Sequence, residues 1–377
     1  MTDAATTALD PASRVSLTVG GNAWEGWTSV DVTASLDEQC RSFQIGIARL
    51  GPGGIDQVPI QHGDRCQLRI GQDLVVTGYV FATPKAHDPQ STAFGIAGRS
   101  LTADLVDCAA INKPPQFKQR SMRAIATALA APYGIAVVSQ VGEGEVVADH
   151  TIQPGETVFE SVDRLLKIGR LLSTDDAEGR LVLAAPGSAG RATDPIEVGR
   201  NVQAGDCGFD FSECFSEYRV IGQHATGNHR NGAAANEIAG TAADSRIARK
   251  RVKVITESGN LTPVMATTRA QWERDHRIGK ALTTNYEVAG WRQSDGRLWQ
   301  VNQIVRVIDP ILGFDRDMLI VSCNYRLDDH GSVVRMVVAP PEGYQPEPPD
   351  PEKRKKNRKK KGDKFEYLLP SDWEPNT

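Results

Sequence analysis

Residues of the types that carry out chemistry are present in this sequence, but their spacing does not form a recognisable catalytic or metal site. The seven histidines are dispersed, and the closest pair, His224 and His229, lies at the edge of a segment rich in glycine, alanine and asparagine. The sequence shows no further ligands to complete a metal site around that pair. Asp175 and Asp176 could act as paired carboxylates, but the glycine that follows at position 179 favours a hairpin turn.

Motifs of the common cofactor and nucleophile sites are also missing. The chain has no G-x-S-x-G elbow, no H-E-x-x-H helix and no P-loop. Gly142-x-Gly144 lacks the third glycine of a dinucleotide-binding fingerprint and indicates a turn. We therefore expect a protein that is not an enzyme and that has no catalytic residues, no cofactor and no metal site.

The strongest charge feature is a basic block near the end of the chain. Its side chains are Lys353, Arg354, Lys355, Lys356, Arg358, Lys359, Lys360 and Lys361. Like charges cannot pack together, so the pattern predicts a solvated tail. The alternatives are an electrostatic arm for an acidic protein surface or for nucleic acid. Flanking acids and the lack of interleaved aromatic residues argue against nucleic acid. Trp373, in a short aromatic end, completes the candidate partner-binding residues.

The bulk composition is that of a globular protein with more than one domain. A length of 377 residues favours two or three domains, and a net charge of −4 provides no overall field that recruits nucleic acid or membranes. The six cysteines are scattered, which is typical of reduced thiols. Residues 1–13 lack the features of a signal peptide, and no apolar stretch is long enough to span a bilayer. We expect no membrane anchor and folding in a cytoplasm.

The elements that would position any site begin with a β domain over residues 1–109. Apolar and polar residues alternate there, as in Val15, Leu17 and Val19 and again in Phe43, Ile45 and Ile47. A period of two is typical of half-buried strands, and glycine-rich turns separate the runs. Many short strands with frequent turns indicate an antiparallel barrel or sandwich.

The period changes in residues 110–190, which predicts a small α/β insert. Ser121 can cap one helix, and the segment from Thr157 to Glu160 is a capping box for a second. The segment 152–172 has a PGET-then-helix pattern that is similar to the peptidoglycan-binding LysM module. That likeness implies an alternative function, a tail protein that binds or degrades cell wall.

A second β domain is expected from residues 191–225 and 286–340. Between its two parts, residues 226–285 are interpreted as a long loop followed by a helix from about 266 to 282, with Trp272 off its apolar stripe. Segment 300–338 has the same plan as segment 60–98, which is a weak internal repeat. We therefore predict a mainly β fold with two similar antiparallel β-barrel domains, a small α/β domain, and a proline-rich basic tail over residues 341–377.

Several stretches, taken in order, resemble the baseplate hub family of Mu-like contractile-tail phages. They span roughly residues 15–341, and the ordered set is more specific than any one of them. The stretches are Gly78-Tyr79-Val80, 98–108 (GRSLTADLVDC), 153–159 (QPGETVF), 218–223 (YRVIGQ), 290–293 (GWRQ), 296–299 (GRLW) and Asp309-Pro310.

The resemblance implies a structural protein of the virion tail baseplate that is assembled in the host cytoplasm. In related hubs, which include those of T-even phages and the type VI secretion spike, each subunit contributes two similar barrels. A homotrimer would then join the six-fold tail tube to the three-fold central spike, with a channel for the tape measure protein and DNA. The implied partners are the chain itself, the tube, spike and tape measure proteins and other baseplate proteins, but no sequence-specific nucleic acid.

Overall fold

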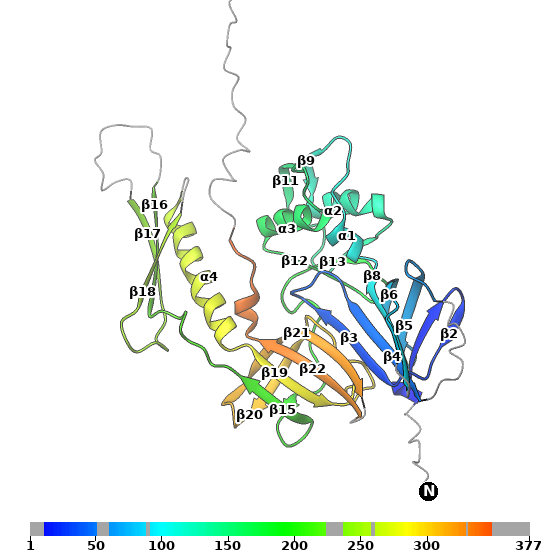
Figure 1. Cartoon of the computed structure of the whole chain (residues 1–377). Helices are drawn as coiled ribbons and strands as arrows, with labels where there is room; N and C mark the ends of the chain where they lie inside the picture. The colour runs from blue at the N-terminus through cyan, green and yellow to red at the C-terminus, as the bar shows by residue number, and fades with distance from the viewer. Residues whose placement is uncertain are drawn as a thin grey trace, which may run out of the picture.

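The computed structural model describes residues 11–50, 60–87, 91–223, 237–257, 261–328 and 331–348. Most of its elements are β-strands, arranged in one large sheet and three small ones, so the prediction of a mainly β chain is confirmed. Figure 1 shows the large sheet at the base of the molecule, with an α/β unit above it and a second helical unit to the left.

In the first half of the chain, alternating apolar residues form the expected strands of the large sheet. Val15, Leu17 and Val19 are buried on one side of the first strand, as a period of two requires. The strands are β1 (Val15–Val19), β2 (Asn22–Trp24), β3 (Ser29–Ser35), β4 (Ser42–Leu50), β5 (Arg65–Ile70), β6 (Asp73–Ala82), β7 (Lys85–His87) and β8 (Ser91–Ser100).

The rest of the large sheet comes from the second half of the chain. Its longest strand, of 15 residues, has buried residues at alternate positions over much of its length and pairs with β20, β22 and β3. The strands are β14 (Ile196–Glu197), β15 (Val202–Cys207), β19 (Thr284–Ala289), β20 (Ile304–Asp309), β21 (Phe314–Asp328) and β22 (Gly331–Ala339).

The two halves have the same strand order. In the first half the order across the sheet is β3-β4-β8-β6-β5-β1, and in the second it is β15-β19-β22-β21-β20-β14. When the short strands β2 and β7 are left out of the count, both are the second, third, sixth, fifth, fourth and first strands of their half in chain order. One pair differs, because β1 is antiparallel to β5 whereas β14 is parallel to β20. The long strands β6 and β21 also share a register shift, at Phe81 and at Val321.

Separate closed barrels are not present among the described residues. β3 of the first half pairs with β21 of the second half, so the two halves form one continuous sheet of 14 strands. Buried side chains of both halves belong to a single core, which includes Val32 and Tyr325. The prediction of two β-barrel domains is corrected, because the described strands of the two halves do not close on themselves. Instead, an edge strand of the first half, β3, pairs with β21 of the second.

The α/β insert stands above the first half and has its own core. α2 begins at the predicted cap, where Ser121 Oγ accepts a hydrogen bond from the Ala124 amide. α3 begins with the predicted capping box of Thr157 and Glu160. Its elements are α1 (Ala103–Asp107), β9 (Gln116–Ser121), α2 (Met122–Ala130), β10 (Val137–Ser139), β11 (Val146–Thr151), α3 (Val158–Gly169), β12 (Leu172–Asp175) and β13 (Leu181–Ala184).

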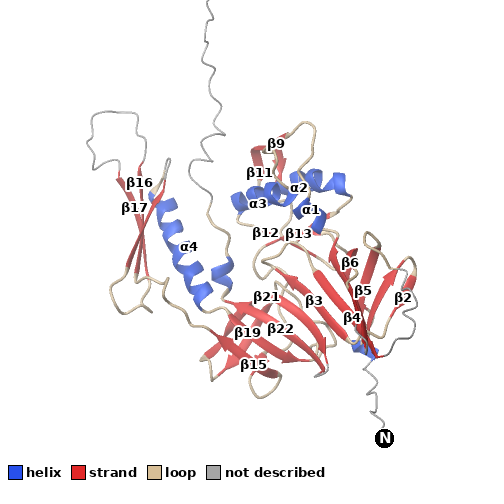
Figure 2. Cartoon of the chain, viewed as in Figure 1, coloured by secondary structure: helices blue, strands red, loops and turns tan. Residues whose placement is uncertain are grey.

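A fourth element group, the α4 unit, interrupts the second half. β16 (Glu217–Gln223) lies between β17 (Glu237–Ala243) and β18 (Val252–Glu257), and α4 (Pro263–Ala281) packs on one face of this small sheet. Figure 2 shows the longer helices in this unit and in the insert, with a short 3-10 helix, Pro11–Ser13, at the foot of the large sheet. Two expectations are therefore corrected. β16 does not join the second half of the large sheet, and the segment interpreted as a loop contains two strands, β17 and β18.

Candidate assembly interface

The seam between the two halves is a β ladder with side-chain contacts along it. Ser322 to Leu327 of β21 run antiparallel to Val30 to Ser35 of β3. On the outer face of the ladder, Asn324 Nδ2 donates to Asp31 Oδ1 at 2.6 Å and to Thr33 Oγ1 at 2.7 Å. The inner face is apolar and buried, so strand pairing and core packing act together to hold the halves in one relative position.

Arg292 fixes the same arrangement at a second point. Its guanidinium Nη2 donates to the Ala12 carbonyl at 2.8 Å and to the Ile70 carbonyl at 2.9 Å, and Nη1 contacts the Asp73 carboxylate. Arg292 belongs to the second half, and its three partners belong to the first. One planar cation with several fixed donors is suited to joining backbone segments in this way.

Two strand edges that correspond to the seam lack a partner in the part of the chain that the structure describes. β15 occupies the place of β3 in the repeat and has β19 as its one partner strand among the described residues, apart from an isolated bridge between Val202 and Val198. β7 comes after the register shift of β6, just as the second part of β21 comes after the register shift of β21. β7 is therefore the equivalent of the part of β21 that pairs with β3, but among the described strands it pairs with β8 alone. Its residues are all exposed. Inside the chain, the edge of β3 pairs with the edge of β21. The equivalent outer edges, those of β15 and β7, have no such partner strand among the described residues.

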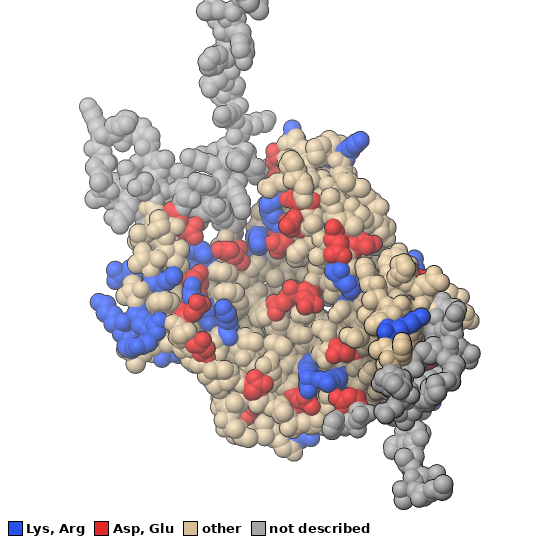
Figure 3. Space-filling view, in the orientation of Figure 1, with Lys and Arg blue, Asp and Glu red and all other residues tan. Residues whose placement is uncertain are grey.

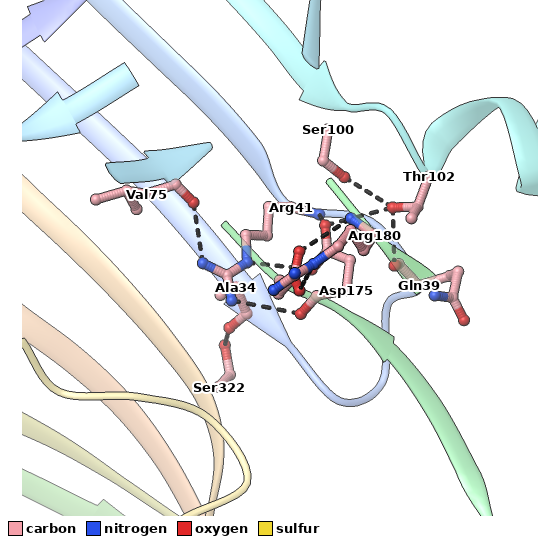
Figure 4. A network of polar contacts seen from close by, with 10 residues as sticks. Ala34, Gln39, Arg41, Val75, Ser100, Thr102, Asp175, Arg180 and Ser322 are labelled. Carbon is pink, nitrogen blue, oxygen red and sulfur yellow. Dashed lines mark hydrogen bonds and ion pairs between the residues drawn. The ribbon is translucent and has the colours of Figure 1, made fainter. Parts of the chain in front are cut away.

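The junction of the insert with the large sheet contains a buried ion pair (Figure 4). Arg41 Nε donates to Asp175 Oδ1 at 3.1 Å, and the Arg41 amide donates to Oδ2 at 3.0 Å. Thr102 Oγ1 lies 3.3 Å from the same oxygen and 2.8 Å from Ser100 Oγ. Arg41 also donates to the Val75 carbonyl at 2.9 Å. The network joins β12 of the insert to the β3–β4 loop and to β6.

The two adjacent aspartates therefore do not work as a pair. Burial raises the pKa of the Asp175 carboxyl, and the Arg41 guanidinium opposes that rise. Asp176 lies in the turn after β12 and accepts a hydrogen bond from Arg180 Nε at 2.6 Å. The predicted hairpin turn is confirmed, and each carboxylate has its own arginine.

Three further titratable side chains, Cys66, Cys323 and His150, are buried. All six cysteines are free, as expected, and burial raises the pKa of the Cys66 and Cys323 thiols to about 12. Burial, with a contribution from the Arg164 cation, lowers the pKa of His150 to about 4, and its Nε2 lies 2.9 Å from Ser161 Oγ. Within the described residues, no cluster of three or more His, Cys, Asp or Glu could hold a metal ion.

The first residues of the predicted tail are not a free spacer. Residues 341–348, here called the strap, run along α4. Trp272 Nε1 donates to the Gln345 carbonyl at 2.6 Å, and His276 Nδ1 lies 3.1 Å from the Gly343 carbonyl. Arg269 forms an ion pair with Glu347 at 2.8 Å. Trp272, which lies off the apolar stripe of the helix, thus contacts the strap.

The predicted partner-binding residues lie outside the described residues. This holds for the basic block, Lys353 to Lys361, and for Trp373. His224 and His229 lie outside them as well. Sequence reasoning missed the strand edges and Arg292, although the glycines and tryptophans around Arg292 are a local signal of a special turn.

Comparison with known proteins decides the family. The chain is 34% identical to "Baseplate hub protein gp44" of Escherichia phage Mu over 342 residues, which covers 88% of this chain and 89% of that protein. The chain belongs to the Mu-type baseplate hub family. Three family models match this hub chain: Mu phage baseplate assembly protein GpP-like, N-terminal, at residues 14–100, baseplate hub protein gp44-like, second domain, at 102–185, and Mu phage baseplate assembly protein GpP, fourth domain, at 262–347.

Solved structures agree with this assignment. The hub chain is 31% identical to the 43 kDa tail protein of prophage MuSo2 from Shewanella oneidensis, with a TM-score of 0.79 over 89% of this chain and all of that one. A type VI secretion component of E. coli, described as similar to the T4 tail proteins gp27 and gp5, has a TM-score of 0.52 at 9% identity. The match covers 89% of the hub chain and 79% of the type VI secretion component. It shows a likeness of fold alone.

The family assignment gives the hub chain a structural role in a phage tail baseplate. Its relatives are structural baseplate proteins. Among the described residues, no helix is both long and apolar enough to cross a membrane. In the LysM-like segment, four apolar residues of α3 are buried in the insert core, so they serve packing; they are Val158, Val162, Leu165 and Leu166.

Proposed function

We propose that three copies of this chain form a ring that joins the tail tube to the central spike of a contractile tail. Each copy contributes two units of like design, so three copies present six units to the tube and three copies of every other feature to the spike. A structural junction between six-fold and three-fold components needs both symmetries.

The observation that carries this proposal is the repeated strand order, together with the seam inside the chain. β3 of one unit pairs with β21 of the next within a single chain. The equivalent outer edges of β15 and β7 have no partner strand among the described residues, since β15 pairs with β19 and β7 with β8 on their inner edges alone. If β15 of one copy pairs with β7 of the next, every contact around the ring is of the same kind. A heterologous contact of that type closes into a ring when its rotation divides a full turn.

The ring would act by position. One face would contact the tube protein and the other the spike protein, with further baseplate proteins at the periphery. The channel would let the tape measure protein and then DNA pass during genome ejection. Assembly would take place in the host cytoplasm, before the particle leaves the cell.

The insert and the tail have separate roles in the proposal. The insert (residues 110–190) would face the spike or the baseplate periphery. A structure of an assembled tail with the insert against the tube ring would overturn that placement. The basic block Lys353–Lys361 would attach to an acidic protein surface, which fits a block of cations that cannot pack with one another.

Sedimentation equilibrium of the purified full chain tests the ring. The expected mass at micromolar concentration is three times the chain mass of 40.9 kDa. A strict monomer, or a dimer that does not grow with concentration, would contradict it. Obligate interfaces commonly bury more than about 2,000 Å², so the trimer should persist on dilution.

A further inference from the structure

The α4 unit carries a concentrated positive surface that the ring does not use. Figure 3 shows blue side chains gathered at the left of the molecule, over the loop before β18. The segment 246–253 contains five cations, which are Arg246, Arg249, Lys250, Arg251 and Lys253. Arg246 pairs with Asp244 at 2.7 Å. The other four form no ion pair within the described part of the chain.

Two carboxylates of the same unit form their ion pairs with other arginines. Glu217 pairs with Arg219 at 2.6 Å, and Glu213 pairs with Arg277 at 3.3 Å. The half-buried ring of Phe215 holds part of the patch in position. The Arg251 guanidinium lies 4.9 Å from its centroid and the Lys253 ammonium 5.7 Å, both as cation–π contacts. Arg251 Nη2 also donates to the Ser212 carbonyl at 2.6 Å. The positive charge is therefore preorganised.

The same segment leads into a strand edge with free backbone groups. β18 is the outer strand of the order β17-β16-β18 and runs parallel to β16. The Arg251 carbonyl accepts from the Glu217 amide at 3.1 Å, so the backbone at 251 faces β16. Because the direction alternates along a strand, the amides and carbonyls of Val252, Val254 and Thr256 face outward. The side chain of Val254 is exposed at 52%.

From the free edge and the cations beside it, we infer that β18 is a docking site for an acidic, extended segment of another protein, which adds to the α4 unit as a fourth strand. Backbone hydrogen bonds to residues 252, 254 and 256 supply the affinity, as in other cases of strand addition. The unpaired cations before β18 select acidic side chains at one end of the segment. An apolar side chain of the segment would pack on Val254.

The test uses the full chain and a short synthetic peptide of alternating glutamate and valine. Hydrogen exchange of backbone amides, measured by mass spectrometry, should slow by about tenfold over β18 when the peptide is present. The affinity should fall on the order of tenfold between low and high salt, because exposed charges are screened. A peptide of alternating lysine and valine should not bind. If the glutamate peptide leaves β18 unprotected, the inference is wrong.

Two variants separate strand addition from general charge attraction. Val254→Pro removes an outward amide but no hydrogen bond to β16, so it should abolish binding while Val254→Thr retains it. R249E/K250E should lose binding, whereas the matched pair K118E/R120E on the insert should not. Single-stranded DNA provides the alternative ligand. If DNA binds the wild type and Val254→Pro equally well and the peptide does not bind, the positive patch is a nucleic-acid site and the inference is wrong.

Discussion

At the scale of single residues, a few buried polar side chains hold the units of the chain together. The Arg41–Asp175 pair joins the insert to the large sheet, and both side chains are largely shielded from water. The Asp176–Arg180 pair, in the next turn, has a more exposed arginine. We expect the two ion pairs to contribute differently to stability because they differ in burial. A carboxylate that loses its partner in a buried site cannot recover its hydration.

We therefore predict that Arg41→Ala lowers the free energy of unfolding by about 3–5 kcal/mol. The matched variant Arg180→Ala should cost at most about 1 kcal/mol, because its ion pair is half in solvent. Urea denaturation followed by fluorescence measures both. Equal effects of the two variants would show that the buried pair does not hold the insert in place.

A second prediction at this scale concerns pH. His150 has a pKa of about 4 in the folded chain and 6.5 in its ordinary state. Between these values the unfolded chain binds a proton that the folded chain does not, so stability is present above pH 6.5 and is lost as the pH falls. The loss amounts to about 3 kcal/mol. His150→Gln should remove this part of the pH dependence in denaturation curves measured from pH 7 to pH 4, and an unchanged dependence would exclude His150 as its source.

Local signals at the residue scale were visible in the sequence, and distant pairs were not. The caps at Ser121 and Thr157 are predictable because a cap and its helix are adjacent in the chain. Asp175 meets Arg41, a residue 134 positions away, and nothing beside either residue indicates the other. Arg292 likewise reaches Ala12 across 280 positions.

At the scale of elements, the strap (residues 341–348) packs on α4, so a truncation that removes the tail but keeps the fold should end after residue 348. Six prolines over residues 340–351 predict an extended spacer, and within that segment itself no pattern indicates that residues 341–348 pack on α4. In the structure, Gly279 and Gly343 bring α4 and the strap into backbone contact, where a Cβ at either position would clash. β17 was missed for a related reason, since a strand of small residues lacks the apolar alternation that indicates one.

A chain that ends at residue 348 should keep the thermal stability of the full chain, whereas one that ends at residue 340 should melt several degrees lower. The second truncation removes the strap and so exposes the face of α4 that carries Trp272 and His276. Differential scanning calorimetry compares the two. If the basic tail attaches to an acidic partner, the first truncation should also weaken baseplate assembly in a salt-dependent way. Equal melting of both truncations would mean that the strap adds nothing to α4.

At the scale of the whole molecule, the two halves share a strand order and meet along one seam. Alternation and the weak repeat between residues 60–98 and 300–338 indicated both β domains and their likeness. They did not reveal that β3 and β21 join the halves into one sheet, because pairing between distant strands leaves no local pattern. The same seam, repeated between copies, is the central claim of the proposed ring.

Lys85 provides a direct test of that claim. The Gly95 amide donates to the Pro84 carbonyl at 2.9 Å, so the backbone at 84 faces β8 and the backbone at 85 faces outward. Lys85→Pro removes this outward donor without a loss of bonds to β8, and Lys85→Ala controls for the side chain and its contact with Phe94. The decisive measurement is the mass of the three proteins by sedimentation equilibrium. We predict a trimer for the wild type and Lys85→Ala, and a folded monomer for Lys85→Pro. A Lys85→Pro trimer as stable as the wild type would contradict the pairing of β15 with β7.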